Sequence, residues 1–322
     1  MKLIVVIDGD LLVTEDPDQG MQGQKDAISQ IVRRLGVLLD NGHELVIVHG
    51  NAPQVGYMLL RGEAARHVVH SLPLDICGAD TQGATGYMLQ QAISNWLHQH
   101  EIEKEIVTLI TQVEVNGADL ISPPYTKGIG PYFNWERVQA DQHNRGWEFK
   151  LFPGLGYQRV VPGLMPKKVI EATQVRHMLE RGVIVICAGG GGIPVRSDEN
   201  GDLIGVDAVV DKAYTCVLLA QEIDCDLIIF VSPRDRIVGS YDLNLTNGLQ
   251  EIDLKKIDTL INRYEMEDTM RHKLIASKQF LQQGGNKTVL ILPPDQLGAD
   301  PSSCCGVQLG SEAYVTSFRS QL

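Results

Sequence analysis

Four consecutive glycines are the most distinctive chemical feature of this sequence: Gly189, Gly190, Gly191 and Gly192. They directly follow an apolar segment at 183–187 that is typical of a buried strand. Because glycine has no Cβ, several backbone N–H groups can converge on one anion in such a loop. A flexible turn is the alternative, but the position at the end of a strand favours contact with a phosphate or a substrate. The loop matches neither the Walker A pattern nor the dinucleotide-binding pattern.

A second polar loop follows the apolar segment at 45–49, where the chain reads His-Gly-Asn-Ala-Pro-Gln. Asn51 and Gln54 of this loop carry amide groups that could bind a small carboxylate-like ligand. The same residue types are also common where a polar side chain only shapes a turn, so the loop alone does not decide between the two interpretations.

Short apolar segments rich in β-branched residues alternate with amphipathic segments along the chain. The predicted strands lie at 3–7, 45–49, 106–111, 183–187, 227–231 and 288–292. The predicted helices lie at 27–39, 86–97, 169–179, 213–223, 254–261 and 266–281. This alternation indicates the α/β class, with a mainly parallel sheet that is covered on both faces. Such a sheet binds ligands beyond the carboxyl ends of its strands, where the polar and glycine-rich loops gather.

The segment from about 119 to 158 does not follow this alternation. It contains Trp135 and Trp147 but no clear periodicity, and we interpret it as an insertion or flap. The length of 322 residues is sufficient for one large domain, or for two lobes that share one sheet.

The composition excludes several classes of protein. Hydrophobic residues make up 43% and charged residues 21%, as in a soluble globular protein. The formal net charge of −12 argues against a non-specific nucleic-acid binder, because the phosphate backbone requires a basic surface. The apolar run at 3–7 is too short for a signal peptide, and no membrane-spanning run follows, so we expect a cytoplasmic protein. The six cysteines form no C-x-x-C pair, which argues against a zinc site.

Several motifs together resemble the carbamate kinase family of the amino-acid kinase superfamily. They extend from about residue 3 to residue 285, which is nearly the whole chain. The matching segments are H-G-N-A-P-Q-V-G at 49–56, T-Q-G at 81–83 with G-Y-M-L-Q-Q at 86–91, T-Q-V-E-V at 111–115, T-K-G-I-G at 126–130, R-V-V at 159–161, the glycine loop with I-P-V at 193–195, and V-D-A-V-V-D-K at 206–212.

The resemblance implies a three-layer αβα sandwich on a mainly parallel sheet, in one domain that spans residues 1–322. An N-terminal lobe at 1–165, with the flap at 119–158, would bind carbamate or carbamoyl phosphate. A C-terminal lobe at 166–322 would bind the nucleotide. The implied reaction converts ATP and carbamate reversibly to ADP and carbamoyl phosphate with Mg²⁺, in arginine or nitrogen metabolism. The resemblance also implies a homodimer, and we expect no nucleic-acid or membrane partner.

The resemblance also assigns roles to individual residues. Lys127, Lys212 and Lys273 would neutralise the charge of the moving phosphoryl group, and Asp211 could orient Lys212. The residues implied to contact the substrate or phosphate are Gly9, Asp10, Gly50, Asn51, Gln54, Gly189, Gly190, Gly191 and Gly192. The residues implied to contact the nucleotide are Lys212, Ser232, Asp235 and Lys273.

Several segments depart from the family pattern, among them 162–166 and 232–237, and two of them bear on the choice between functions. The family reads G-G-N-A after its first strand, but this chain reads D-G-D-L at 8–11. Two like charges about 4 Å apart repel by roughly 1 to 4 kcal/mol, so Asp8 and Asp10 would oppose a bound phosphate. Alternatively they could bind magnesium, or turn away and cap the following helix. The second segment, at 268–272, reads D-T-M-R-H where the family has G-S-M-x-P.

Two hypotheses therefore remain open. The three lysines, the glycine loop and the H-G-N-x-P-Q pattern support an active kinase for carbamate or another small carboxylate-like acid. The charged loop at 8–10 and the altered segment at 268–272 support a family member with reduced or lost activity that acts as a ligand-binding or regulatory protein. An assay that forms ATP from ADP and carbamoyl phosphate separates them.

Overall fold

The structure is a computed structural model of the chain. It describes residues 1–13, 20–40, 42–120, 125–145, 147–152, 154–233, 249–252, 254–263, 268–297 and 306–310. Within these ranges no helix has the length and apolar character needed to cross a membrane.

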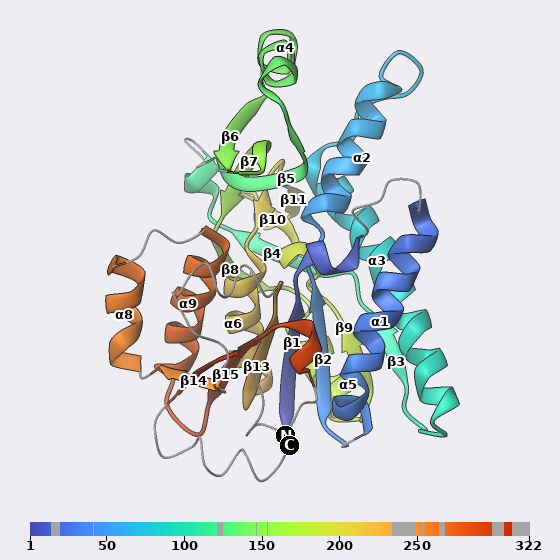
Figure 1. The fold of residues 1–322 in the computed structure, drawn as a ribbon, viewed down its shortest axis with the longest axis vertical. Helices are drawn as coiled ribbons and strands as arrows, with labels where there is room; N and C mark the ends of the chain where they lie inside the picture. The colour runs from blue at the N-terminus through green and yellow to red at the C-terminus, as the bar shows by residue number, and fades with distance from the viewer. Residues whose placement is uncertain are drawn as a thin grey trace.

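An eight-stranded sheet runs through the middle of the molecule, in the order β14-β16-β15-β13-β1-β2-β9-β3 (Figure 1). Its neighbouring strands are parallel except for β15 and β16, which are antiparallel. The strands are β1 (Lys2–Ile7), β2 (Glu44–His49), β3 (Ile106–Thr108), β9 (Ile184–Ile186), β13 (Leu227–Val231), β14 (Leu249–Ile252), β15 (Thr288–Leu292) and β16 (Gly306–Leu309). All six predicted strands belong to this sheet.

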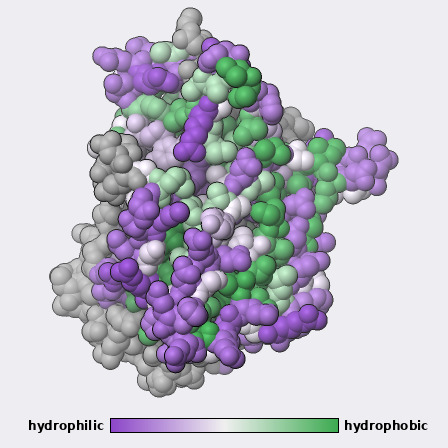
Figure 2. All heavy atoms as spheres, turned by 90° about the vertical axis from the view of Figure 1, so that its right-hand side faces the viewer, coloured by the Kyte–Doolittle hydropathy of each residue, from purple (hydrophilic) through white to green (hydrophobic). Residues whose placement is uncertain are grey.

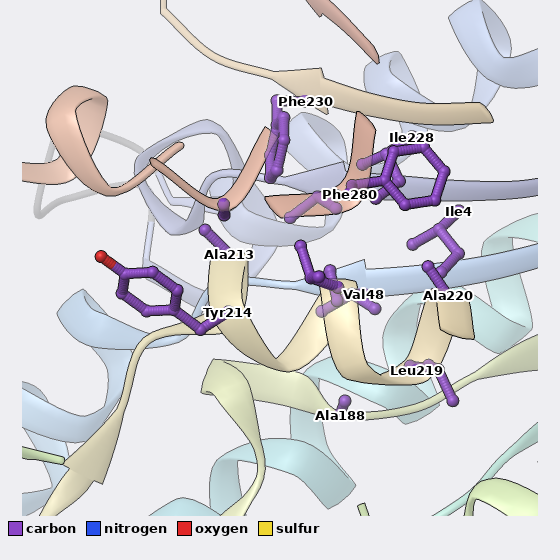
Figure 3. Close-up of a cluster of buried hydrophobic side chains, with 14 of the residues drawn as sticks. Ile4, Val48, Ala188, Ala213, Tyr214, Leu219, Ala220, Ile228, Phe230 and Phe280 are labelled. Carbon is purple, nitrogen blue, oxygen red and sulfur yellow. The ribbon is translucent and has the colours of Figure 1, made fainter. Parts of the chain in front are cut away.

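Helices cover both faces of the large sheet (Figure 1). The helices are α1 (Gly20–Asp40), α3 (Leu74–Gln99), α5 (Ala172–Leu179), α6 (Lys212–Ile223), α8 (Leu254–Arg263) and α9 (Asp268–Leu281). Side chains of β1 alternate between the two faces: Leu3 and Val5 belong to the hydrophobic cluster with α1 and α3, whereas Ile4 and Val6 belong to the cluster with α5, α6 and α9. Figure 3 shows the second cluster around Ile4. The predicted three-layer αβα sandwich is confirmed.

Shorter elements cover the carboxyl ends of the central strands. They are α2 (Ala52–Ala64), β4 (Gln112–Val115), β5 (Tyr125–Phe133), α4 (Trp135–Arg145), β6 (Glu148–Phe152), β7 (Gly156–Leu164), β8 (Pro166–Val169), β10 (Ile193–Ser197), β11 (Leu203–Gly205), β12 (Val209–Val210) and the 3-10 turns η1 (Gly9–Leu12), η3 (Gly117–Leu120), η4 (Gly189–Gly191) and η6 (Pro294–Gln296). The strands form two small sheets, β11-β10-β4-β8 and β12-β7-β5, with β6 paired to β7.

The segment that we interpreted as an irregular flap contains regular structure. Strands β5, β6 and β7 pair antiparallel, and α4 stands at the outer end (Figure 1). The periodicity was hidden because the pairing of β5 with β7 shifts register twice, between Tyr125 and Lys127 and between Ile129 and Tyr132. Helix α4 gave no apolar signal because Val138 is its one buried hydrophobic side chain among the described residues.

Helix α2 was also missed, because the polar segment at 49–56 looked like a loop throughout. The helix begins at Ala52, with Pro53 in its first turn, where proline is favoured because the missing N–H has no partner within the helix. This proline is the sequence signal that could have indicated the helix.

The predicted lobe boundary at residue 165 is not a boundary of the large sheet. Strand β9 follows this boundary in the sequence, yet it lies between β2 and β3, which precede it. The two halves of the chain therefore share one sheet. The functional division into an acid-binding lobe and a nucleotide-binding lobe stays a prediction.

His49 at the end of β2 is buried against the glycine loop. Its side chain is 1% exposed, and its Nδ1 lies 3.1 Å from the carbonyl oxygen of Gly50. A Cβ at position 189 would lie 2.5 Å from His49 Nε2, so Gly189 is required for this packing. Burial, offset in part by the hydrogen bond to Gly50, lowers the pKa of His49 from 6.5 to about 4.

We predict that His49 makes the protein less stable in mild acid. Below pH 6.5 the unfolded chain takes up a proton at this residue while the folded chain does not, so stability falls as the pH falls towards 4. From pH 7 to pH 5 this linkage amounts to about 2 kcal/mol. Urea denaturation at both pH values measures the free energy of unfolding. From pH 7 to pH 5, this free energy should fall by about 2 kcal/mol less in His49→Gln than in the unsubstituted chain. Equal losses in the two proteins would contradict this role.

We also predict that Gly56→Ala separates α2 from the flap. A Cβ at position 56 would lie 2.0 Å from the Cα of Gly130 in β5, so one backbone must move. Overpacking of this kind costs about 1–3 kcal/mol, and we expect that loss in the free energy of unfolding measured with urea.

Gly62→Ala is the matched control, because it lies in the same helix and a Cβ there would meet no atom within 4 Å. It should be neutral or stabilising by up to about 1 kcal/mol. If both variants have the same stability, the close approach of Gly56 and Gly130 is not a constraint.

Candidate active site

A cavity lies beyond the carboxyl ends of β1 and β2, beneath the flap. It is lined by Asp8, Gly9, Asp10, Gly50, Asn51, Ala52, Pro53, Val55, Lys127, Gly128, Ile129, Tyr132, Phe152, Gln158, Gly190, Val209, Val210, Asp211, Lys212, Asp268 and Thr269. The cavity therefore receives side chains from the first two strands, the flap, the glycine loop and the starts of α6 and α9. An ion pair between Lys150 in β6 and Asp268 in α9 joins the flap to the helix beside the cavity.

Asp8 is the centre of a buried cluster of charges at the end of β1. The Nζ of Lys273 donates to Asp8 Oδ2 at 2.6 Å, and the Nζ of Lys212 lies 2.9 Å from Asp8 Oδ1. The hydroxyl of Ser232, which follows β13, donates to Asp8 Oδ2 at 2.7 Å and accepts a hydrogen bond from Lys273. Asp8, Lys273 and Ser232 are each at most 2% exposed.

The charges of this cluster stabilise one another in the ionised form. Burial alone would raise the pKa of Asp8, but the ammonium groups of Lys212 and Lys273 outweigh it and hold that pKa well below its ordinary range. Burial alone would lower the pKa of Lys212, but Asp8 and Asp211 raise it instead. The carboxylate of Asp8 therefore stays ionised throughout the physiological pH range.

Asp211, the residue before Lys212, organises a second group of charges. Its Oδ1 accepts a hydrogen bond of 2.8 Å from the backbone N–H of Ala213, so it caps helix α6. Its Oδ2 forms an ion pair with Lys127 of the flap and lies 2.7 Å from Nδ1 of His272. Burial would raise the pKa of Asp211, but Lys127 and His272 outweigh it and hold the pKa well below its usual range.

Two of the three predicted lysines face the cavity. Lys127 and Lys212 are among its lining residues, and their ammonium groups are held by two aspartates. Lys273 is not a lining residue, because it lies behind Asp8 with its side chain 2% exposed. Ser232 shares this buried position, and Asp235 lies outside the described residues.

The glycine loop contributes one residue to the cavity, Gly190. The N–H groups of Gly191 and Gly192 bond within the turn, to the carbonyl oxygens of Ala188 and Gly189. Two glycines of the loop permit close contacts. A Cβ at Gly190 would lie 2.2 Å from Asn51 Oδ1, and a Cβ at Gly191 would lie 2.5 Å from the carbonyl oxygen of Val210 in β12. The φ angles from +69° to +98° at positions 190 to 192 favour glycine as well.

The first two strand-end loops touch each other at the floor of the cavity. A Cβ at Gly50 would lie 2.4 Å from the nitrogen of Gly9, so position 50 needs glycine for this approach, and a Cβ at Gly9 would lie 3.0 Å from the carbonyl carbon of Gly50. Asn51 donates a hydrogen bond of 2.8 Å to the hydroxyl of Thr81, which fixes its amide beside Gly190. The amide of Gln54 is buried away from the cavity lining and makes no hydrogen bond within the described residues.

His272 was not among the predicted site residues. It lies 3.2 Å from the Nζ of Lys127 as well as 2.7 Å from Asp211. Its position directly before Lys273, in the segment that departs from the family pattern, is the signal that could have found it. Gln82 was also missed: its amide bonds to Gly189 and Thr111, and so it supports the glycine loop from α3.

Asp8 does not fit the suggested role of a magnesium ligand. Both of its oxygens already face ammonium groups, which would repel a divalent cation. Across the described ranges, no group of three or more acidic, histidine or cysteine side chains could hold a metal ion. Asp10 lines the cavity and remains a candidate for contact with a cation that a ligand brings along.

Comparison with known proteins identifies relatives of this chain. The model of the amino acid kinase family matches residues 1–292. A carbamate kinase-like protein of Escherichia coli is 36% identical over 305 residues, which cover 92% of this chain and 95% of that protein. The carbamate kinase of Pyrococcus horikoshii is 33% identical over 296 residues, 90% of this chain and 93% of that protein.

Solved structures agree with these relatives. Carbamate kinase from Giardia lamblia bound to citric acid superimposes with a TM-score of 0.84 and 25% identity over 96% of this chain and 98% of that one. The same enzyme bound to AMP-PNP gives a TM-score of 0.80 and 26% identity, again over 96% of this chain and 98% of that one. The chain therefore belongs to the amino acid kinase family, in its carbamate kinase branch.

Proposed function

We propose that this protein is a carbamate kinase-type phosphotransferase, which converts ATP and carbamate reversibly to ADP and carbamoyl phosphate. The observation that carries the proposal is that Lys127 and Lys212 line the same cavity, each held by a buried aspartate. The names of the relatives, and the AMP-PNP bound by the Giardia enzyme, support the same chemistry.

The reaction requires little covalent participation by the protein. A carbamate oxygen attacks the terminal phosphorus of ATP, and the bond from that phosphorus to the bridging oxygen of ADP breaks. Because the attacking oxygen is already anionic, no general base is required, and the protein has to align the reactants and neutralise charge. Lys127 and Lys212 would supply that neutralisation, with Asp211 keeping Lys127 in place.

We assign the small acid to the loop at Gly50 and Asn51, under the flap, and the nucleotide to the side of α6 and α9. The first assignment is supported by Gly50 and Asn51, which line the cavity beside Gly190 of the glycine loop. In this scheme Lys212, at the first turn of α6, lies between the two ligands and would contact the transferred phosphoryl group. The division into an N-terminal acid-binding lobe and a C-terminal nucleotide-binding lobe follows from it.

Magnesium would enter with the nucleotide. When bound, it would neutralise phosphate charge, and it keeps several waters in most nucleotide sites, so few protein ligands are needed. Among the residues that the structure describes, the side chains of this cavity do not form a cage for the ion, and Asp8 is excluded by its two ammonium partners.

A second candidate function is a catalytically impaired family member that binds a ligand or regulates a partner. The observation that favours it is Asp8 itself, because a fixed negative charge on the cavity wall opposes phosphate. Turnover decides between the two functions: ATP formation from ADP and carbamoyl phosphate above the uncatalysed background supports the kinase. No turnover, together with nucleotide binding in a calorimeter, supports the impaired member.

The cysteines support the cytoplasmic location that belongs to this proposal. Cys77, Cys187, Cys216 and Cys225 are buried and unpaired, as expected for thiols in a reducing compartment. A role in arginine or nitrogen metabolism would follow from the reaction.

We further propose that the protein is a homodimer that uses the face formed by α3 and the edge strand β3. Figure 2 shows a band of hydrophobic residues on that side of the molecule. Tyr87 in α3 is 57% exposed, and Ile110 just after β3 is 45% exposed; both line one shallow hollow. Exposed apolar groups beside an unpaired sheet edge are typical of surfaces that a partner covers.

Sedimentation tests the dimer. We expect a particle of twice the 35.5 kDa chain mass, and a shift to the monomer in Tyr87→Glu with Ile110→Glu, because two buried carboxylates would oppose association. Leu155→Glu, which replaces another exposed apolar residue on the flap, is the control and should stay dimeric. A monomeric unsubstituted chain contradicts the proposal, and a double variant that stays dimeric contradicts the choice of face.

The two cavity lysines can be tested by substitution. Lys127→Ala and Lys212→Ala should each lower ATP formation by about 10²- to 10³-fold, the usual effect of removing one group that stabilises a developing charge. Lys278→Ala is the control, since it removes an ion pair with Asp258 on the surface of α8 and α9 and should leave the rate unchanged. Undiminished turnover in either cavity variant would refute the role given to that lysine.

A further inference from the structure

Asp8 is a charged residue of the cavity wall for which the phosphotransfer reaction has no use. Its side chain is 2% exposed and receives three donors: the ammonium groups of Lys212 and Lys273, and the hydroxyl of Ser232. Two ammonium groups and a hydroxyl are also the kind of donor set that binds phosphate oxygens. The carboxylate thus occupies donors that would otherwise be available to an anionic ligand.

Asp8 lies between Lys273 and the cavity, and this order decides which charges a ligand meets. Asp8 and Lys212 both line the cavity, whereas Lys273 lies behind the carboxylate and does not. The ammonium group of Lys273 is 2.6 Å from Asp8 Oδ2, so a ligand in the cavity meets the carboxylate before it meets that lysine. The charge of Lys273 is thereby compensated inside the protein.

We propose that Asp8 is a built-in anion that competes with the ligand's phosphate group for Lys212 and withdraws Lys273 from it. The residue sets the charge that the cavity accepts: the site disfavours a free polyphosphate and selects a phosphoryl group whose charge is already reduced by a divalent cation. This inference rests on the proposed function in one respect, which is that the ligand of the cavity is a nucleotide phosphate.

The test measures binding and not turnover, so it can fail independently of the proposed function. Calorimetry with ADP, in the absence and in the presence of Mg²⁺, would compare the unsubstituted chain with Asp8→Asn. Asparagine keeps the size of the side chain and removes its charge. We expect the affinity for magnesium-free ADP to rise by about tenfold or more, equivalent to about 1.4 kcal/mol, and the affinity for ADP with Mg²⁺ to rise clearly less.

Asp10→Asn is the matched control. Asp10 lies two positions further along the same loop and lines the same cavity, but its side chain is exposed to solvent. Its charge is screened by water, so its removal should raise the affinity for magnesium-free ADP by less than about threefold. An equal rise in both variants would show that general charge, and not the contacts of Asp8, controls binding, and would overturn the proposal.

Asp8→Asn leaves the buried Lys273 and the partly buried Lys212 with less compensation and could unfold the protein. A second variant therefore combines Asp8→Asn with Lys273→Met, which removes both members of the buried ion pair. Because Lys212 lines the cavity and loses its carboxylate partner in this variant too, the double variant should still bind magnesium-free ADP more tightly than the unsubstituted chain. If folded Asp8→Asn, or the double variant, binds this ligand no more tightly, Asp8 does not compete with phosphate.

Discussion

The ion pairs of Asp8 with Lys212 and Lys273 are the interaction on which the geometry of this site depends. They join the end of β1 to the start of α6 and to the second turn of α9, and Ser232 adds the end of β13. These segments are separated by up to 265 residues in the sequence. Loss of one member of a buried ion pair typically costs about 3–5 kcal/mol, because the other charge is left without compensation. The cluster therefore fixes where Lys212 stands relative to the sheet.

Asp211 extends the same arrangement to the flap. It caps α6, beside Lys212, and binds Lys127, so the second cavity lysine is positioned by the same helix start. Catalysis of phosphoryl transfer depends on positive charges that are in place before the reaction begins. Here each cavity lysine is held by a carboxylate, which supplies order and at the same time reduces the net positive charge that a phosphate encounters. The two aspartates differ in that Asp211 binds Lys127, a flap lysine that lines the cavity, whereas Asp8 separates Lys273 from the cavity.

The central sheet was predictable because its strands are continuous apolar runs such as those at 3–7 and 227–231, and burial on both faces requires that pattern. The position of the site was predictable too, since parallel strands bring Gly9, Gly50 and Gly190 to one edge. The pairing of Asp8 with Lys273 could not be predicted, because the sequence around either residue does not specify a partner so distant in the chain. The flap strands were not predicted, because bulges interrupt the alternation of their side chains. His272 was not predicted as a site residue, because its partners come from β5 and from the cap of α6.

A crystal structure of the protein with AMP-PNP and Mg²⁺ would show directly which lysines bind the phosphates. We expect that the terminal phosphate lies in the cavity, within hydrogen-bonding distance of the Nζ atoms of Lys127 and Lys212, while Lys273 stays bound to Asp8. Phosphates that lie outside this cavity, or a terminal phosphate bound directly by Lys273, would contradict this expectation.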